Sequence, residues 1–192
     1  MIRPSLLCAA ALSLVLVACD RGAPEMEAEA VPNAAEPREA ALTPQGWGPI
    51  RIGMTSEQLA LAVGPLDDTG DFGECVEGRP ANGPEGLLVM TEQGVVTRIS
   101  AIRDSDLKTE AGFGIGDSAA EIKAALGDQA RVEPHKYQGP PAEYITVWSG
   151  EAPDGYVQNS AARGVVYEIG DAGTVQAIRV GGPSIQYVEG CA

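Results

Sequence analysis

The order of hydrophobic and polar positions in residues 48–59 recurs without a gap in residues 111–122. In both stretches a hydroxyl residue precedes Gln or Glu by three positions, as Thr55 precedes Gln58. This spacing is typical of a capping box, in which two side chains satisfy free backbone amides at a helix start. Each stretch therefore predicts a short helix that ends at a glycine. The helix starts, apolar stripes and stops are Thr55, Leu59, Ala62, Val63 and Gly64 in the first copy, and Ser118 (with Glu121), Ile122, Ala125, Leu126 and Gly127 in the second.

Apolar and β-branched runs after each predicted helix indicate antiparallel strands. Two pairs of runs flank short connections that contain glycine, residues 92–94 and 170–173, and each pair is typical of a β-hairpin. The predicted strands, in chain order, are residues 75–77, 86–91, 95–102, 144–148, 164–169, 174–180 and 185–188.

A helix followed by antiparallel strands, twice, predicts an α+β fold. We expect two tandem helix-plus-antiparallel-meander repeats, residues 45–110 and 111–192, packed as one unit. Chains of about 60–70 residues bury only about 60% of their surface and are marginally stable alone, so each repeat needs the other. Their strands should form one joined or side-by-side sheet surface.

The N-terminal residues have the layout of an export signal. Arg3 precedes an uncharged, mostly apolar run over residues 4–18, which is shorter than the roughly 20 apolar residues of a membrane-spanning helix. The run ends in Leu16-Val17-Ala18-Cys19, which resembles the lipobox of bacterial lipoproteins. The pattern predicts a lipoprotein signal peptide at 1–18 and acylation of Cys19. The alternative is an ordinary signal peptide with a cysteine near its end.

A lipid on Cys19 would make the membrane a partner of the chain and place the domain in the bacterial cell envelope, facing the periplasm. Asp20 resembles a retention signal for the inner membrane in some bacteria, so the sequence leaves inner and outer membrane open. Residues 19–44, from the lipidated cysteine onward, are rich in Ala, Glu and Pro, and we expect them to form a disordered tether.

The cysteines fit an exported protein. Cys8 would leave with the signal and Cys19 would carry lipid, so Cys75 and Cys191 remain. Two thiols in an oxidising compartment are expected to form a disulfide, and the alternative is a pair of buried free thiols.

Charge and composition argue against several functions. The formal net charge is −14, which repels nucleic acid. One histidine, His135, and no Cys-x-x-Cys pair argue against a zinc site, and His135 lies in a polar, proline-bounded segment typical of a loop. Residues 112–116 lack the spacing of a phosphate-binding loop. We therefore predict no catalytic, cofactor-binding or metal-binding residues.

Five residues are candidates for contacts with a partner. Trp47 and Tyr137 are aromatic residues outside the strongly periodic segments, and aromatic residues concentrate in interfaces. Thr97, Arg98 and Arg179 are polar positions of predicted strands and are expected to point outward.

The first copy, residues 50–59 followed by Gly64-Pro65-Leu66, resembles the SmpA/OmlA (BamE-like) lipoprotein domain. Two such units in tandem are similar in architecture to the β-lactamase inhibitor proteins. The resemblance implies a non-enzymatic module that binds an envelope protein or takes part in assembly. The alternative is a small envelope hydrolase or a glycan-binding protein, which a deep pocket lined by two facing carboxylates would favour over a smooth concave sheet.

We expect the Cys19→Ala variant to appear in the soluble fraction, because it lacks the acyl chains that bind the membrane at about 0.8 kcal/mol per buried methylene. Fractionation of cells that express the full chain, followed by a salt wash, measures this. Sedimentation of the variant with membranes after the wash would refute the lipoprotein interpretation.

Overall fold

The computed structural model describes residues 40–150 and 155–191, without the side chains of residues 68–72. The predicted signal peptide (1–18), Cys19 and the tether up to residue 39 lie outside the described residues. None of the described helices is long and apolar enough to cross a membrane.

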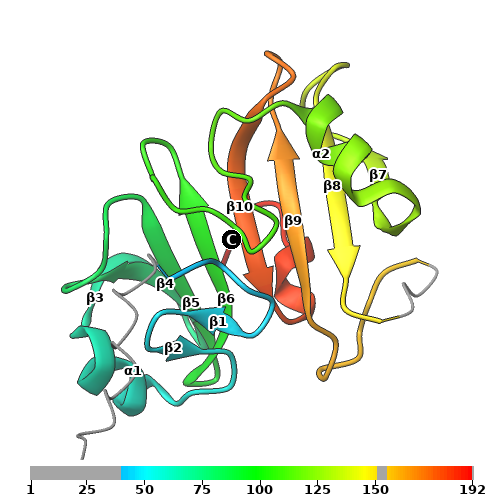
Figure 1. Cartoon of the computed structure of the whole chain (residues 1–192). Coiled ribbons are helices and arrows are strands. Elements are labelled where there is room, and N and C mark those ends of the chain that lie inside the picture. Colours follow the sequence, from blue (N-terminus) through cyan, green and yellow to red (C-terminus); the bar gives the residue numbers. More distant parts are fainter. Residues whose placement is uncertain (1–39, 151–154, 192) are drawn as a thin grey trace, which may run out of the picture. The chain divides into compact units, whose positions relative to one another are not determined.

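The described part of the chain contains two short α-helices and an eight-stranded antiparallel sheet, which confirms the predicted α+β class (Figure 1). A separate two-stranded sheet precedes the first helix. The elements are β1 (Gly46–Trp47), β2 (Ile50–Arg51), α1 (Ser56–Val63), β3 (Leu66–Phe72), β4 (Cys75–Pro80), β5 (Leu87–Glu92), β6 (Val95–Ile102), α2 (Ala119–Leu126), the 3-10 helix η1 (Gly127–Gln129), β7 (Arg131–Pro134), β8 (Glu143–Trp148), β9 (Gly164–Ile169), β10 (Val175–Gly181) and the 3-10 helix η2 (Pro183–Gln186).

The strand order of the large sheet is β3-β4-β5-β6-β10-β9-β8-β7, so β6 and β10 lie at its centre. These two strands run antiparallel, with Ile99 opposite Val180 and Ala101 opposite Ile178. Strands β3 to β6 form a meander that makes up one half of the sheet, and strands β7 to β10 form a meander that makes up the other half. One helix precedes each meander along the chain.

Both helices begin and end where the sequence predicts. Thr55 caps α1 in a complete capping box with Gln58, and the helix stops at Gly64. Ser118 caps α2 differently: its hydroxyl accepts the amide of Ala120 instead of that of Glu121. The reciprocal box predicted for α2 is therefore wrong in detail, although the cap residue is correct.

The strand predictions hold for the two hairpins and fail at the C-terminal end. Strands β6 and β9 have the predicted bounds, and the two-residue turn of the first hairpin has positive φ at both Gln93 and Gly94. The predicted strand at 185–188 is wrong, because this region contains η2 instead. Strand β10 already pairs with β6 and β9, so no edge beside it is free to accept another strand. Strands β1, β2, β3 and β7 were not predicted.

The main hydrophobic core lies between the two helices and one face of the sheet. Leu59 and Val63 of α1 and Ile122 of α2 pack in one cluster with the inward residues of the strands. Leu42 is fully buried in the same cluster, and its amide donates to the carbonyl of Lys108. The prediction that the tether extends to residue 44 is therefore wrong, because the folded region already includes Leu42.

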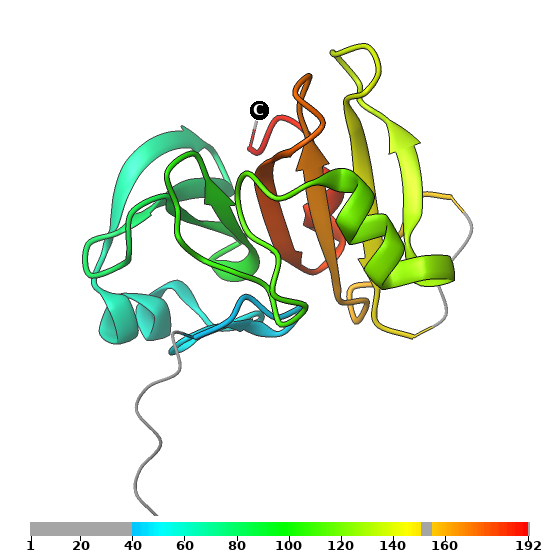
Figure 2. The same cartoon turned by 45° about the horizontal axis from the view of Figure 1, so that its top comes forward.

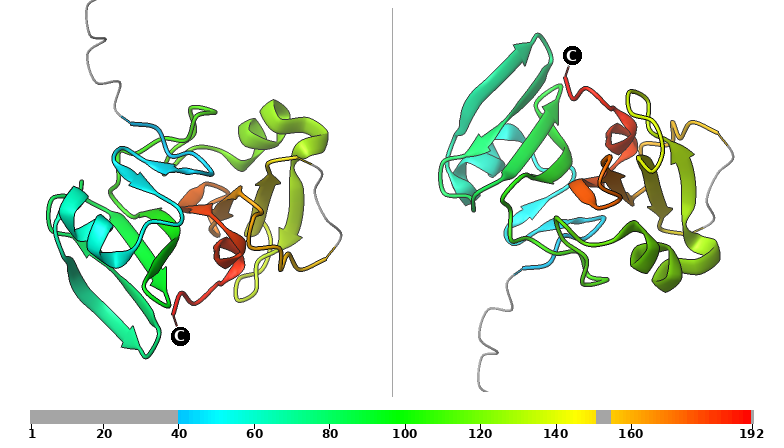
Figure 3. Two further views of the ribbon diagram at one scale, coloured as in Figure 1. Left: turned by 90° about the horizontal axis from the view of Figure 1, so that it is seen from below. Right: turned by 90° about the horizontal axis from the view of Figure 1, so that it is seen from above.

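The C-terminal segment, residues 182–191, covers the second face of the sheet, opposite the helices. Figure 3 shows α2 and η2 on opposite sides of β9 and β10, and Figure 2 shows both helices on the same side of the strands. Ile185 of this segment is fully buried in a second cluster with Tyr144, Trp148 and Val166. The second face of the sheet therefore carries a second, smaller hydrophobic core.

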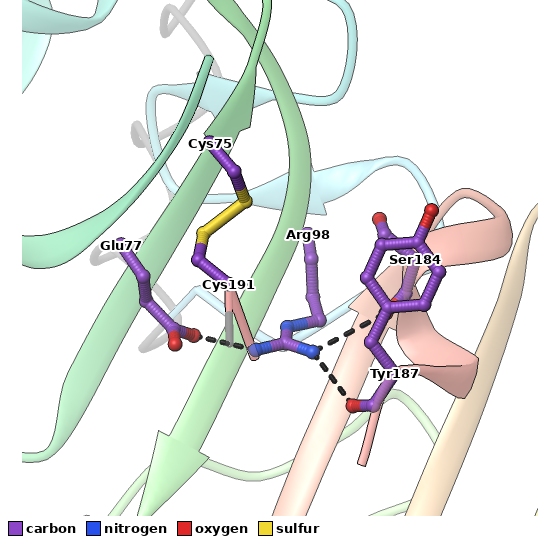
Figure 4. The surroundings of a disulfide bond; sticks show 6 residues. All are labelled: Cys75, Glu77, Arg98, Ser184, Tyr187 and Cys191. Atoms are coloured by element: carbon purple, nitrogen blue, oxygen red, sulfur yellow. Dashed lines mark hydrogen bonds and ion pairs between the residues drawn. A yellow bond between two sulfur atoms is a disulfide. The ribbon is translucent and has the colours of Figure 1, made fainter. Parts of the chain in front are cut away.

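A disulfide joins Cys75 of β4 to Cys191 at the end of the C-terminal segment, in agreement with the predicted pair (Figure 4). The two α-carbons lie 5.5 Å apart, which is within the usual range for a disulfide. The bond connects the C-terminal segment, which follows β10, to a strand of the other meander.

We expect the Cys75→Ser/Cys191→Ser double variant to have a free energy of unfolding lower by at most about 4–5 kcal/mol, because the disulfide closes a long loop. Urea unfolding with and without reductant measures the change. Alkylation mass analysis of the unreduced wild type should find neither thiol free. If reductant destabilises the double variant as much as the wild type, the effect does not come from this bond.

Candidate functional site

An open pocket of about 420 Å³ lies on the second face, over β8, β9 and β10. The volume falls in the range of ligand-binding pockets, about 300–1,000 Å³. Strand residues form its floor, β7 forms one rim, and the C-terminal segment forms the opposite wall. The lining residues are Arg131, Glu133, Pro134, Tyr144, Thr146, Trp148, Gly155, Tyr156, Val166, Arg179, Ile185, Gln186 and Val188. We call this the second-face pocket.

The alternation of strand β8 sets the floor of the pocket. Tyr144, Thr146 and Trp148 are every second residue of the strand, so their side chains share one face. Gly164, opposite Trp148 on β9, leaves the space that the indole occupies. A Cβ at this position would lie 2.8 Å from Cε3 of Trp148.

A buried charge network lies beneath the floor and is centred on Glu168 of β9. The carboxylate accepts a hydrogen bond at 2.7 Å from Gln176, and it forms an ion pair at 2.9 Å with the guanidinium of Arg179. The third donor is His135, whose Nε2 lies 3.3 Å from the carboxylate. The Nδ1 atom of His135 accepts the backbone amides of Tyr137 and Gln138, so the proton of the neutral ring is on Nε2.

The ring of Tyr144 packs against two members of this network. It stacks on His135 at a centroid distance of 4.7 Å, and Cζ of Arg179 lies 5.4 Å from its centroid. Burial raises the pKa of the Tyr144 hydroxyl, and the negative charge of Glu168 raises it further. Burial lowers the pKa of Arg179, while Glu168 acts in the opposite direction. Glu168 is therefore the counter-charge that keeps a cation stable under the pocket.

The rim of the pocket is polar and partly exposed. Arg131 and Glu133 of β7 form an ion pair at 3.1 Å, and the carboxylate of Glu133 is 53% exposed. Arg131 also donates to the carbonyl of Gly155, which ties the β8–β9 connection to this rim. Tyr156, 60% exposed, lines the pocket at this end.

The C-terminal wall is held by hydrogen bonds from both meanders. Gln186 accepts the amide of Val157 and donates to its carbonyl, so this side chain holds the wall against the β8–β9 connection. The carbonyl of Tyr187 accepts from both Arg98 at 3.0 Å and Arg179 at 2.8 Å. Figure 4 shows Arg98 extended between Glu77 and the C-terminal segment.

The five candidate contact residues differ in how far the structure exposes them. Arg98 and Arg179 are only 3% and 5% exposed, so the prediction that they point outward into solvent is wrong. The C-terminal segment covers them, and each guanidinium has a carboxylate partner. Thr97 and Trp47 are half-buried, and Thr97 lines a different hollow of about 360 Å³. Tyr137 is exposed, as predicted for a contact residue, although its role in binding is not tested by this exposure.

Sequence reasoning did not assign the floor of the pocket to a site. Tyr144 and Trp148 lie in the predicted strand 144–148, and both side chains are mostly buried. His135 was expected to be a loop residue, but its ring is buried against Tyr144. The alternation of β8 could have placed Tyr144, Thr146 and Trp148 on one face. No local signal could have shown that the C-terminal segment turns that face into a pocket.

The edge strand beside the pocket is poorly suited to pair with another strand. The amide of His135 donates to Ala142 across the β7–β8 hairpin. By antiparallel alternation, Val132 and Pro134 turn their backbone groups away from β8. Pro134 has no amide hydrogen, so this short edge has one outward donor, that of Val132. Ligands are therefore expected at the pocket and not along the edge.

In comparisons with known proteins, no family model, no curated protein and no solved structure matches this chain. The chemistry of the pocket must therefore be inferred from its own residues. Residues 40–150 and 155–191 contain no group of three or more His, Cys, Asp and Glu residues that could hold a metal ion. Among the described residues, the lining includes one carboxylate, Glu133, together with aromatic rings and two guanidinium groups.

We expect Glu168→Gln to lower the free energy of unfolding by about 3–5 kcal/mol, because it leaves the cation of Arg179 buried without a counter-charge. The matched control is Glu133→Gln, which removes the same charge from an exposed pair and should cost less than about 1 kcal/mol. Urea unfolding at neutral pH measures both. Equal effects of the two substitutions would show that the network under the pocket does not stabilise the fold as described.

Proposed function

We propose that this chain is a lipid-anchored lipoprotein of the bacterial cell envelope that acts as a non-enzymatic binding module, and that the second-face pocket is its binding site. The observation that carries the site is the open pocket of about 420 Å³, whose floor of strand side chains lies over the buried ion pair of Glu168 with Arg179 and the hydrogen bond from Gln176 to Glu168. Rigid floors of this kind favour recognition, because little conformational entropy is lost on binding.

The N-terminal pattern supports the membrane anchor. The apolar run that ends at Cys19 favours acylation of that residue, and the Ala-, Glu- and Pro-rich stretch after it would hold the pocket away from the membrane surface. The disulfide between Cys75 and Cys191 fits an oxidising compartment such as the periplasm.

We also propose that the two halves of the domain are copies of one repeat related to the SmpA/OmlA lipoprotein domain. The recurring sequence pattern supports this, and so does the strand order. Outward from the central pair, β5, β4 and β3 follow β6 in the same way that β9, β8 and β7 follow β10. Strand β7 then takes the place of β3 in the second copy.

The geometry favours binding over hydrolysis by paired carboxylates. Such hydrolysis needs two carboxyl groups that face each other across the substrate, about 5–10 Å apart. Glu133 is the one carboxylate in the described lining, and it is paired with Arg131. Glu168 lies beneath the floor, where its oxygens contact His135, Gln176 and Arg179.

The family resemblance implies that the partner at this site is a protein. Two exposed tyrosines favour it. Tyr156 lines the pocket near Arg131, and Tyr137 follows the other end of β7 and is 59% exposed. Exposed aromatic residues are enriched among the anchors of protein interfaces.

Photo-crosslinking in intact cells tests the binding site. We expect p-benzoylphenylalanine at position 137 or 156 of the full-length lipoprotein to form covalent adducts with a protein or with insoluble cell-wall material. The matched control position is Leu61, which is 89% exposed on α1 and distant in sequence from the pocket residues. Adducts in equal yield from all three positions, or from position 61 alone, would contradict the assignment of the pocket.

A further inference from the structure

We infer that the second-face pocket binds an uncharged saccharide of one to a few sugar rings. This inference rests on the proposed function, because it names the ligand class of the same site. Three properties of the pocket support it: the charge state of its polar groups, the placement of hydrogen-bonding groups at the rim, and the aromatic composition of its lining.

The first property is that both cations in the described part of the lining already have counter-charges. Arg179 is paired with Glu168 at 2.9 Å, and Arg131 is paired with Glu133 at 3.1 Å. An anionic ligand would either lie beside the carboxylate of Glu133 or displace Glu168 from Arg179, and a cationic ligand would lie beside the guanidinium of Arg131. Breaking the buried pair is costly, because it leaves an uncompensated charge in the interior. The pocket therefore favours a ligand without net charge.

The second property is that donors and acceptors occur side by side. The rim pair presents a guanidinium, which only donates hydrogen bonds, next to a carboxylate, which only accepts them. The hydroxyl of Thr146, which can do both, belongs to the floor. A ligand with neighbouring hydroxyl groups matches this arrangement, because each hydroxyl can donate to Glu133 or accept from Arg131. Saccharides are the common uncharged ligands with that property.

The third property is the number of aromatic residues in the lining. Tyr156 is 60% exposed, and the mostly buried Tyr144 and Trp148 belong to the floor, in a chain whose aromatic content is only 5%. The face of an aromatic ring carries partial negative charge and attracts polarised C–H groups. One side of a sugar ring presents such C–H groups, while its hydroxyls point outward to the rim. A volume of about 420 Å³ is sufficient for a ligand of this size.

An extended peptide that adds a strand to the sheet is a less suitable occupant. The edge beside the pocket has four residues, and Pro134 removes one of its outward donors. A protein could still insert a side chain into the pocket, and this outcome is distinguished by the experiment below.

Tryptophan fluorescence gives a direct test, because Trp148 is part of the lining. The full-length lipoprotein with Trp47→Phe, purified in a detergent without a sugar headgroup, leaves Trp148 as the single reporter. The probes are cellobiose, maltose and N,N′-diacetylchitobiose. We expect a saturable change with at least one of them at millimolar concentration, and affinity at least about tenfold weaker for N-acetylneuraminic acid and for the cationic disaccharide of glucosamine.

Three variants show whether the signal comes from the pocket. Thr146→Val should weaken binding by about three- to tenfold, the loss expected for one hydrogen bond. Tyr156→Ala should weaken it by a similar factor, and Leu61→Ala on α1 should leave it unchanged. Urea midpoints equal to that of the parent would establish that the variants are folded.

The inference is overturned if none of the three disaccharides changes the fluorescence up to ~50 mM, well above the dissociation constants of weak specific ligands. Equal affinity for the charged saccharides would also overturn it. If positions 137 and 156 crosslink a protein while the saccharides have no effect, the ligand class is wrong and the proposed binding function stands. If neither crosslinks nor fluorescence changes occur, both proposals fail.

Discussion

The antiparallel pairing of β6 with β10 is the contact on which the rest of the structure depends. It joins two meanders that are separate along the chain into one sheet, so that both helices pack on a common face. The pairing requires a close approach at its end: Gly181 has a φ of 141°, and a Cβ there would lie 2.4 Å from the carbonyl oxygen of Thr97. Only glycine accepts both that conformation and that distance without strain.

The same pairing brings Arg98 and Arg179 onto neighbouring positions of the second face. Gly181 lies opposite Arg98, and Arg179 is two residues before it on β10. Two cations this close need electron-rich partners, and Glu77, Glu168 and the carbonyl of Tyr187 supply them. The C-terminal segment is therefore held by hydrogen bonds from the two arginines that it buries. The disulfide at Cys191 attaches the end of the segment to β4. The wall of the pocket follows from this arrangement.

Local sequence patterns were sufficient to predict those helices and hairpins whose formation depends on residues close together in the chain. Thr55 with Gln58, and the glycines at 64 and 127, predicted both helices because caps and stops act within one turn. Glycine at 94 and the flanking β-branched residues predicted the first hairpin. Strand β7 was missed, because Arg131–Pro134 is short, mostly exposed and ends in proline, so it carries no alternation to detect. Its pairing with β8 depends on the tertiary fold.

Arg98 and Arg179 show the limit of sequence reasoning most clearly. Both were expected to point outward, and the sequence could not show that residues 182–191 return to bury them. The sequence by itself determined the two helices, the main hairpins and the pair of cysteines, because each depends on adjacent residues or on chemical type. Only the tertiary structure decided the sheet order, the charge network at Glu168 and the second-face pocket, because each unites residues far apart in the chain through packing that no local pattern specifies.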